Sequence, residues 1–173
     1  GRSTHRHRSP GYQPAGIEPE SYTTTFTEDR VEIVRTDGAL TTTLDVVVSP
    51  EDDAEVRRVA IVNGGTRSRD IDVTSYAELV LAPPAADSAH PAFSKLFVQT
   101  EYLPKMGAII ATRRRRSPSE PEVWTAHLAV VEGEVLGEPE IETDRARCLG
   151  RGNEVRTPVA VMDGRPLSNT VGT

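Results

Sequence analysis

Alternation of apolar and polar residues with a period of two most constrains the fold of this chain. It is clearest over residues 71–81. One set of alternate positions there carries Ile71, Val73, Ser75, Ala77, Leu79 and Leu81. The intervening positions are occupied by Asp, Thr, Tyr and Glu, in addition to one valine. Successive side chains of a β-strand point to opposite faces, so the pattern is typical of a strand with one packed face and one face in water. We therefore expect a half-buried strand over residues 71–81.

A second signal is the dipeptide formed by Asp37 and Gly38. It lies between alternating segments at residues 31–35 and 39–48. Asp-Gly pairs tolerate the positive φ angles that tight hairpin turns require. The sequence therefore predicts a two-residue turn at Asp37 and Gly38 that joins the two segments into a hairpin.

The strongest turn signal is Asn-Gly-Gly at residues 63–65. It separates an alternating segment at residues 55–62 from the one at residues 71–81, and we expect these two strands to pair antiparallel. The other expected elements are strands at residues 22–26, 93–102, 108–112, 123–131 and 139–143, a Pro/Ala-rich connector at residues 82–92, and a helical turn at residues 144–149 that begins at Thr143 and ends at Gly150.

Composition agrees with an all-β class. The 173 residues include 13 glycines and 13 prolines but only eight aromatic residues, which suits many short connections between strands better than a helical bundle. We predict an antiparallel β-sandwich with long loops and little helix. Residues 1–20 are rich in Arg, His, Pro and Gly without periodicity, so we interpret them as a loosely attached linker or ragged end. Residues 21–173 are then the sandwich domain.

Charge and hydropathy exclude several classes of function. A net charge of -6 opposes binding to nucleic acid, and we interpret the four arginines at residues 113–116 as a solvated sheet edge or interdomain contact. No apolar stretch approaches the roughly 20 residues that a membrane span needs, so we expect a soluble fragment that does not insert into a membrane. The single Cys148 is expected to be a packed thiol rather than a nucleophile.

The polar loop at residues 142–153 is the candidate site. It concentrates arginines, carboxylates and glycines, a combination suited to fixed contacts with sugar hydroxyls or an anion. Arg147, Arg151 and Asn153 are the candidates for contact with a glycan or cleft. The alternative is an internal salt-bridge network that shapes the loop. We predict no catalytic residue, cofactor or metal, since His5 and His7 lie in a segment too irregular to preorganise metal ligands.

Three segments carry a resemblance to a known family: TSYAELVLAPPAADSAHPAFSKLFVQTEYLP at residues 74–104, PEVWTAHLAVVEGE at residues 121–134 and ETDRARCLGRG at residues 142–152. They resemble the phosphorylase-type part of cyclic β-1,2-glucan synthases, which is similar to cellobiose phosphorylase. The resemblance implies a galactose-mutarotase-like supersandwich that precedes an (α/α)6 barrel. It also implies that the catalytic residues belong to that barrel and not to this segment.

The resemblance further implies a parent protein of the inner membrane, with this region on the cytoplasmic side. We expect the domain to be non-catalytic, to brace the barrel and to border its glucan cleft. The alternatives are an autonomous carbohydrate-binding module, and a dimerisation or interdomain interface without glycan contact. The sequence ends before further sandwich strands are expected, so we also predict exposed sheet edges and a homodimer.

Overall fold

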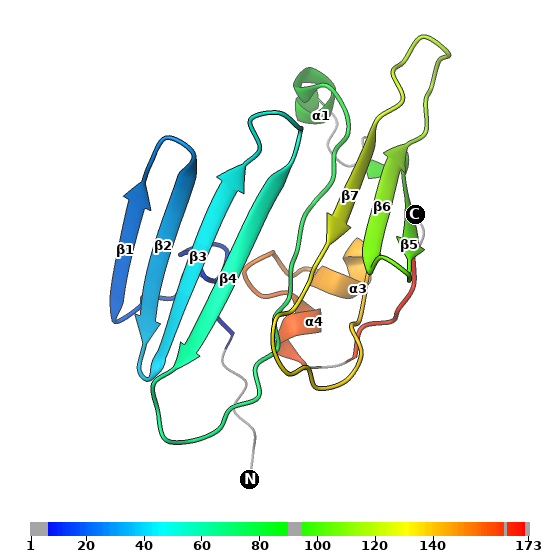
Figure 1. Ribbon diagram of the computed structural model, residues 1–173. Coiled ribbons are helices and arrows are strands. Elements are labelled where there is room, and N and C mark those ends of the chain that lie inside the picture. Colours follow the sequence, from blue (N-terminus) through cyan, green and yellow to red (C-terminus); the bar gives the residue numbers. More distant parts are fainter. Residues whose placement is uncertain (1–6, 90–94, 165, 172–173) are drawn as a thin grey trace. The chain divides into compact units, whose positions relative to one another are not determined.

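The computed structural model describes residues 7–89, 95–164 and 166–171 (Figure 1). These residues form seven strands in two antiparallel sheets and three short helices, which confirms the predicted all-β class with little helix. The elements are β1 (Ser21–Phe26), β2 (Arg30–Asp37), β3 (Leu40–Val48), β4 (Glu55–Asn63), α1 (Pro84–Ala89), β5 (Val98–Leu103), β6 (Ala108–Arg113), β7 (Trp124–Leu128), α3 (Arg145–Leu149) and α4 (Val159–Met162).

The chain divides into two compact units. The first unit comprises residues 1–72 and 153–157, and the second comprises residues 73–152 and 158–173. The first unit contains the four-stranded sheet, and the second contains the three-stranded sheet and all three described helices.

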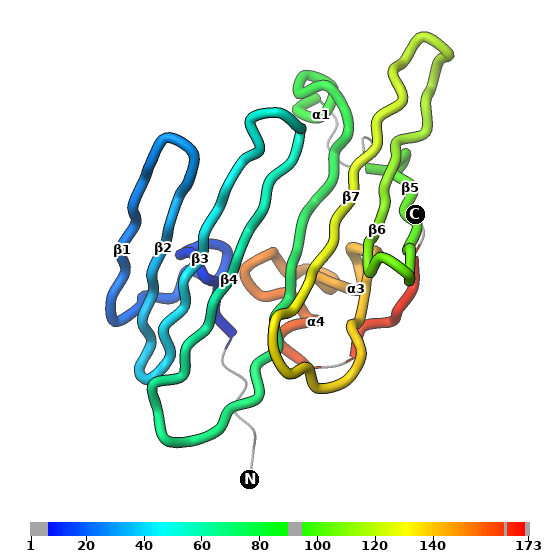
Figure 2. The backbone as a smooth tube through the Cα atoms, in the orientation of Figure 1, coloured from blue at the N-terminus to red at the C-terminus, as the bar shows by residue number. Residues whose placement is uncertain are grey.

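The four-stranded sheet is a meander in which β1, β2, β3 and β4 follow one another in space as in sequence (Figure 2). The predicted hairpin is present, but its turn is displaced by one residue. Asp37 pairs with Leu40, so Gly38 and Ala39 form the two-residue loop, with Gly38 at a φ of 61°. Asp37 stays in the strand because its carboxylate is bound by Arg35 on the same face of β2.

Arg35 is the most deeply buried charged side chain among the described residues, with 1% of its surface exposed. Its Nε donates to Oδ2 of Asp37 at 2.6 Å, and one Nη2 hydrogen donates to Oδ1 at 3.1 Å. The other three N–H groups reach the carbonyl oxygens of Ser9, Gly11 and Ile17 at 3.0–3.4 Å. All five guanidinium donors therefore have an acceptor, which is what allows the charge to be buried.

These contacts hold residues 9–17 against the sheet, which is closer packing than the loose attachment expected from their composition. Ser9 is itself buried, and its hydroxyl donates to the carbonyl of Gly11 at 2.9 Å. Arg8 adds a longer ion pair with Asp37 at 3.5 Å. That residues 1–20 act as a linker stays a prediction. The structure shows that residues 9–17 are anchored to the sheet by Arg35.

The strand predicted at residues 71–81 is wrong. The segment has no regular secondary structure, and β4 pairs with β3. Its polar groups make side-chain contacts instead: the carbonyl oxygen of Val80 accepts from Arg113 at 3.3 Å rather than from a backbone N–H. Leu81 then has a φ of 48°, which leaves the extended conformation before the following prolines. The sequence of this segment alternates between apolar and polar residues, but no strand in the described residues pairs with it.

The connector predicted at residues 82–92 contains a helix that the sequence analysis missed. α1 begins at Pro84, where a proline is tolerated because the first N–H groups of a helix have no partner within it. The alanines that follow favour the helix, and the amide of Ala86 donates to the carbonyl of Pro83 at 2.9 Å. None of the helices in the described ranges is long and apolar enough to cross a membrane.

The three-stranded sheet is a second meander, with β6 between β5 and β7. β6 confirms the predicted apolar strand, and its Ala108 and Ala111 are among the few fully buried apolar residues. β5 and β7 are shorter than expected, and residues 93 and 94 of the predicted 93–102 strand lie outside the described residues. Of the strand expected at residues 139–143, the structure shows one isolated parallel bridge between Glu142 and Thr170.

Candidate functional site

The candidate site is organised by the short helix α3, which confirms the helical turn predicted at residues 144–149. Its N-cap is Asp144 rather than the expected Thr143. The carboxylate of Asp144 accepts hydrogen bonds from the amides of Ala146 at 2.7 Å and Arg147 at 3.3 Å. Thr and Asp are both common at helix N-caps, but Asp144 and not Thr143 directly precedes Arg145, the first helical residue. Gly150 ends the helix at a φ of 84°, as predicted.

A cluster of charged side chains fixes α3 within the second unit. Glu78 accepts hydrogen bonds from the hydroxyl of Tyr76 at 2.7 Å and from Nε of Arg145 at 2.8 Å, and it forms an ion pair with Lys95. Partial burial alone would raise the pKa of Glu78, but the hydrogen bonds from Lys95, Tyr76 and Arg145 outweigh burial and lower it to about 2. The Glu78 carboxylate is therefore a permanently charged anchor for α3 at neutral pH.

A second set of contacts fastens residues 166–170 to residues 140–143. The carboxylate of Glu142 accepts from the hydroxyl of Ser168 at 2.5 Å. Asn169 adds two hydrogen bonds to Ile141, one from its amide to the carbonyl at 3.0 Å and one from the Ile141 amide to its side chain at 2.9 Å. We call this set of contacts the Glu142 latch.

A hollow of about 310 Å³ lies within the second unit beside these elements. α3 and α4, which lie side by side (Figure 1), both contribute to its lining, and the segment held by the Glu142 latch completes it. Its lining mixes polar and apolar side chains: Glu142, Ala146, Arg147, Val159, Ala160, Asp163, Pro166, Leu167 and Ser168.

The three predicted site residues have different positions. Arg147 lines the hollow, with 59% of its side chain exposed and a weak ion pair to Asp144 at 3.7 Å. Arg151 and Asn153 are exposed and do not line it. Contact of any of the three with a glycan stays a prediction. Asp163 and Ser168 were missed because they come from the final twenty residues, which carry no readable periodicity or motif.

The alternative interpretation of the loop is partly present, since Arg145 and Arg147 both form internal ion pairs. Arg147 differs from Arg145 because its closest carboxylate contact is long and its side chain is largely exposed. A guanidinium in this state presents a planar set of donors to hydroxyl or anionic oxygens. The Glu142 carboxylate is instead occupied by Ser168 and by the amide of Asp144 at 2.9 Å. Arg147 is thus the hollow's clearest donor for a ligand.

Other candidate groups make structural contacts. In the described ranges, no three His, Cys, Asp or Glu side chains gather as a metal site would require. His7 lies 3.2 Å from the carbonyl of Arg156, while His5 lies outside the described residues. Partial burial raises the pKa of the Cys148 thiol, which disfavours the reactive thiolate.

Three of the four arginines at residues 113–116 also have internal partners. Arg113 and Arg114 lie over the ring of Phe97, with 5.4 Å and 5.8 Å from guanidinium carbon to ring centroid. Arg116 pairs with Glu120 at 3.2 Å. These contacts help to shape the long β6–β7 connection, so the charge run has an evident local role.

Comparison with known proteins connects this architecture to one family. The model of the glycosyl hydrolase 94 supersandwich domain matches residues 2–173. The cyclic β-(1,2)-glucan synthase NdvB of Rhizobium meliloti (strain 1021) is 42% identical over 160 residues, which are 92% of this chain. The chain spans only 6% of the length of that relative. Both matches confirm the resemblance seen in the sequence, and the first confirms the expected supersandwich class.

Proposed function

Because the chain belongs to the glycosyl hydrolase 94 supersandwich domain family, we propose that it is a non-catalytic domain of a cyclic β-1,2-glucan synthase-like protein. In this role it braces a phosphorylase-like (α/α)6 barrel of the same polypeptide and borders the glucan cleft. The parent protein is a membrane-embedded glycosyltransferase of the inner membrane, and this domain works on its cytoplasmic side.

The observation that supports the proposal most directly is the hydrogen bonding of the polar groups that line the α3–α4 hollow. General acid catalysis needs a carboxyl group that can hold and deliver a proton at working pH. Glu142, one of the two carboxyl groups in the lining, accepts the Ser168 hydroxyl at 2.5 Å as part of the latch. Arg147 supplies hydrogen-bond donors to the hollow. This arrangement supports holding a polar ligand rather than cleaving it.

The cleft role is tested in the complete protein with Arg147→Ala. If Arg147 contacts glucan, this change impairs glucan processing while the protein still folds, because the side chain is 59% exposed and its one ion pair with a described residue is weak. Arg67→Ala is the matched control, since it removes the same charge from an exposed position outside the hollow. Glucan turnover unchanged by Arg147→Ala would remove the cleft contact from the proposal.

The non-catalytic role needs a separate test. The purified 173-residue chain is incubated with linear and cyclic β-1,2-glucans, with and without phosphate, and products are followed by chromatography. We expect no cleavage, transfer or phosphorolysis. Turnover that copurifies with this chain would overturn the non-catalytic assignment, whereas binding without turnover would favour the alternative of an autonomous carbohydrate-binding module.

A further inference from the structure

One face of the three-stranded sheet carries exposed side chains on both of its outer strands, β5 and β7. The strand register places Gln99, Thr112 and Trp124 in one row across β5, β6 and β7, and Glu101, Ile110 and Ala126 in the next. Exposure alternates along both outer strands, and Gln99, Glu101, Trp124 and Ala126 fall on the exposed side. We call this surface, centred on Trp124, the Trp124 face.

Trp124 is the sole tryptophan of the chain, and 58% of its surface is exposed. Its indole Nε1 donates to the carboxylate of Glu122 at 2.9 Å. Thr112, beside it in the row, donates its hydroxyl to the carbonyl of Val123 at 2.9 Å and so holds the start of β7. The hydrogen bond to Glu122 therefore holds the polar edge of the indole, while much of the ring is exposed to water. Exposure of so much apolar surface is unfavourable, and burial in a core would normally avoid it.

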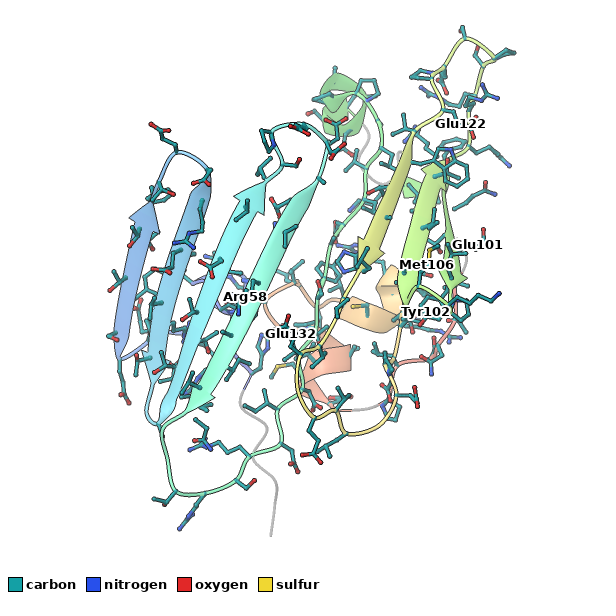
Figure 3. The ribbon with its side chains drawn as sticks, in the orientation of Figure 1. Arg58, Glu101, Tyr102, Met106, Glu122 and Glu132 are labelled. Atoms are coloured by element: carbon teal, nitrogen blue, oxygen red, sulfur yellow. The ribbon has the colours of Figure 1, made fainter. Side chains whose placement is uncertain are left out.

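Polar side chains accompany the ring across the sheet. Neither Gln99 nor Glu101 forms a side-chain hydrogen bond or ion pair with any residue that the structure describes. Gln99 is two strands from Trp124, or roughly 9–10 Å at ordinary sheet spacing. Figure 3 shows Glu101 on β5 and Glu122 just before β7, so carboxylates lie at both ends of the surface. An aromatic platform and uncommitted amide and carboxylate groups thus share one surface.

We propose that the Trp124 face is a second glycan-contact surface, on which one sugar ring stacks against the indole while neighbouring hydroxyls bond to Gln99 and Glu101. The inference rests on the proposed function, which identifies a β-1,2-linked glucan as the ligand. Pyranose rings present an apolar C–H surface to aromatic rings and hydroxyls at their edges, which matches this combination of groups. An apolar protein partner would leave the carboxylate of Glu101 unpaired on binding.

This surface is separate from the α3–α4 hollow. Thr100 follows Gln99 in β5 and points to the opposite face, where its hydroxyl donates to that of Thr143 at 3.1 Å. Thr143 directly precedes the N-cap of α3. The residues around the hollow therefore adjoin one face of the sheet and the Trp124 face is the other. One stacking residue is too little for strong independent binding, so the surface serves to steer a long chain.

The test measures binding of linear β-1,2-glucan oligosaccharides to the complete protein by isothermal titration calorimetry. Trp124→Ala is expected to weaken the affinity roughly tenfold through loss of stacking. Trp124→Phe keeps an aromatic ring and is expected to retain most of the affinity. Val130→Ala is the matched control, because it trims an exposed apolar side chain outside the sheet and should change nothing.

Failure of the inference can be told apart from failure of the proposed function. If the unaltered protein does not bind β-1,2-glucan, both fall. If it binds and Trp124→Ala binds as tightly as Val130→Ala, only the Trp124 face is refuted. Protection of β7 from hydrogen exchange without glucan, together with unchanged affinity in Trp124→Ala, would assign the face to a protein contact and overturn the inference.

Discussion

Glu78 and Arg145 are 67 residues apart in the chain, yet Oε1 of the carboxylate lies 2.8 Å from Nε of the guanidinium. The pair joins an extended segment without regular secondary structure to the first residue of α3. A helix of five residues does not persist in water by itself, so α3 depends on such tertiary contacts. The position of Arg147 at the hollow is therefore a consequence of Glu78 as much as of α3 itself.

Glu78→Gln is expected to destabilise the protein by about 1–2 kcal/mol at neutral pH, because charge-assisted hydrogen bonds become neutral ones at a partly exposed site. The difference should depend on pH. The folded-state pKa of Glu78 is about 2, below its ordinary value of 4.5, so the stabilisation is complete above pH 4.5 and is lost as pH falls towards 2.

Urea denaturation across this pH range measures the effect. The gap between the unaltered protein and Glu78→Gln should close as the pH is lowered. Glu134→Gln, at an exposed position, is the control and should leave the curve unchanged. A gap that stays constant down to pH 2 would contradict a charged Glu78 anchor.

Arg35→Ala is expected to lower the free energy of unfolding by about 3–5 kcal/mol, because it removes five hydrogen bonds and leaves Asp37 without its main partner. Arg35→Lys should lose less but remain destabilised, since an ammonium group cannot match the planar set of donors. Chemical denaturation monitored by circular dichroism checks both. Arg67→Ala, at an exposed position in the same unit, should change stability by less than about 0.5 kcal/mol.

The sequence predicted best what local patterns determine. The hairpin of β2 and β3, the strand β4 and the apolar strand β6 follow from alternation and adjacent turn residues. Residues 71–81 show the limit of the pattern, because alternation reports two faces but not whether a neighbouring strand supplies a ladder. Burial of Arg35 could not be foreseen either, since its acceptors include carbonyls up to 26 residues away.

In the candidate site, too, local patterns predicted some features, and others depend on contacts between distant residues. Arg147 was found from the concentration of polar groups around it, and the end of α3 from Gly150. The hollow itself requires residues 166–168 to return to Glu142, a contact across 26 residues that no local motif encodes. The N-cap is Asp144 and not the adjacent Thr143. Sequence patterns do not locate the end of a helix to within one residue.

Asp144→Ala is expected to destabilise α3 by about 1 kcal/mol, because the amides of Ala146 and Arg147 lose their acceptor. Asp144→Asn should retain most of this stability, since an amide oxygen can accept the same bonds. Amide hydrogen exchange of residues 145–149 measures the fraying. Exchange in Asp144→Ala as slow as in the unaltered protein would show that the carboxylate does not act as the cap.

Glu142→Ala is expected to open the latch without unfolding the sheets. It removes the acceptor for Ser168 and leaves the segment held by the contacts of Asn169 with Ile141, the hydrogen bond from the Leu167 amide to Glu140 and that from the Thr143 hydroxyl to the Thr170 carbonyl. A local loss of about 1–2 kcal/mol corresponds to roughly tenfold faster amide exchange over residues 167–170. Hydrogen-exchange mass spectrometry provides the measurement, with Glu138→Ala as the control because that nearby carboxylate is exposed and forms no hydrogen bond or ion pair with the described residues. If the two variants exchange at the same rate, Glu142 does not hold the wall of the hollow, and the lining around Arg147 depends on other contacts, such as those of Asn169 with Ile141.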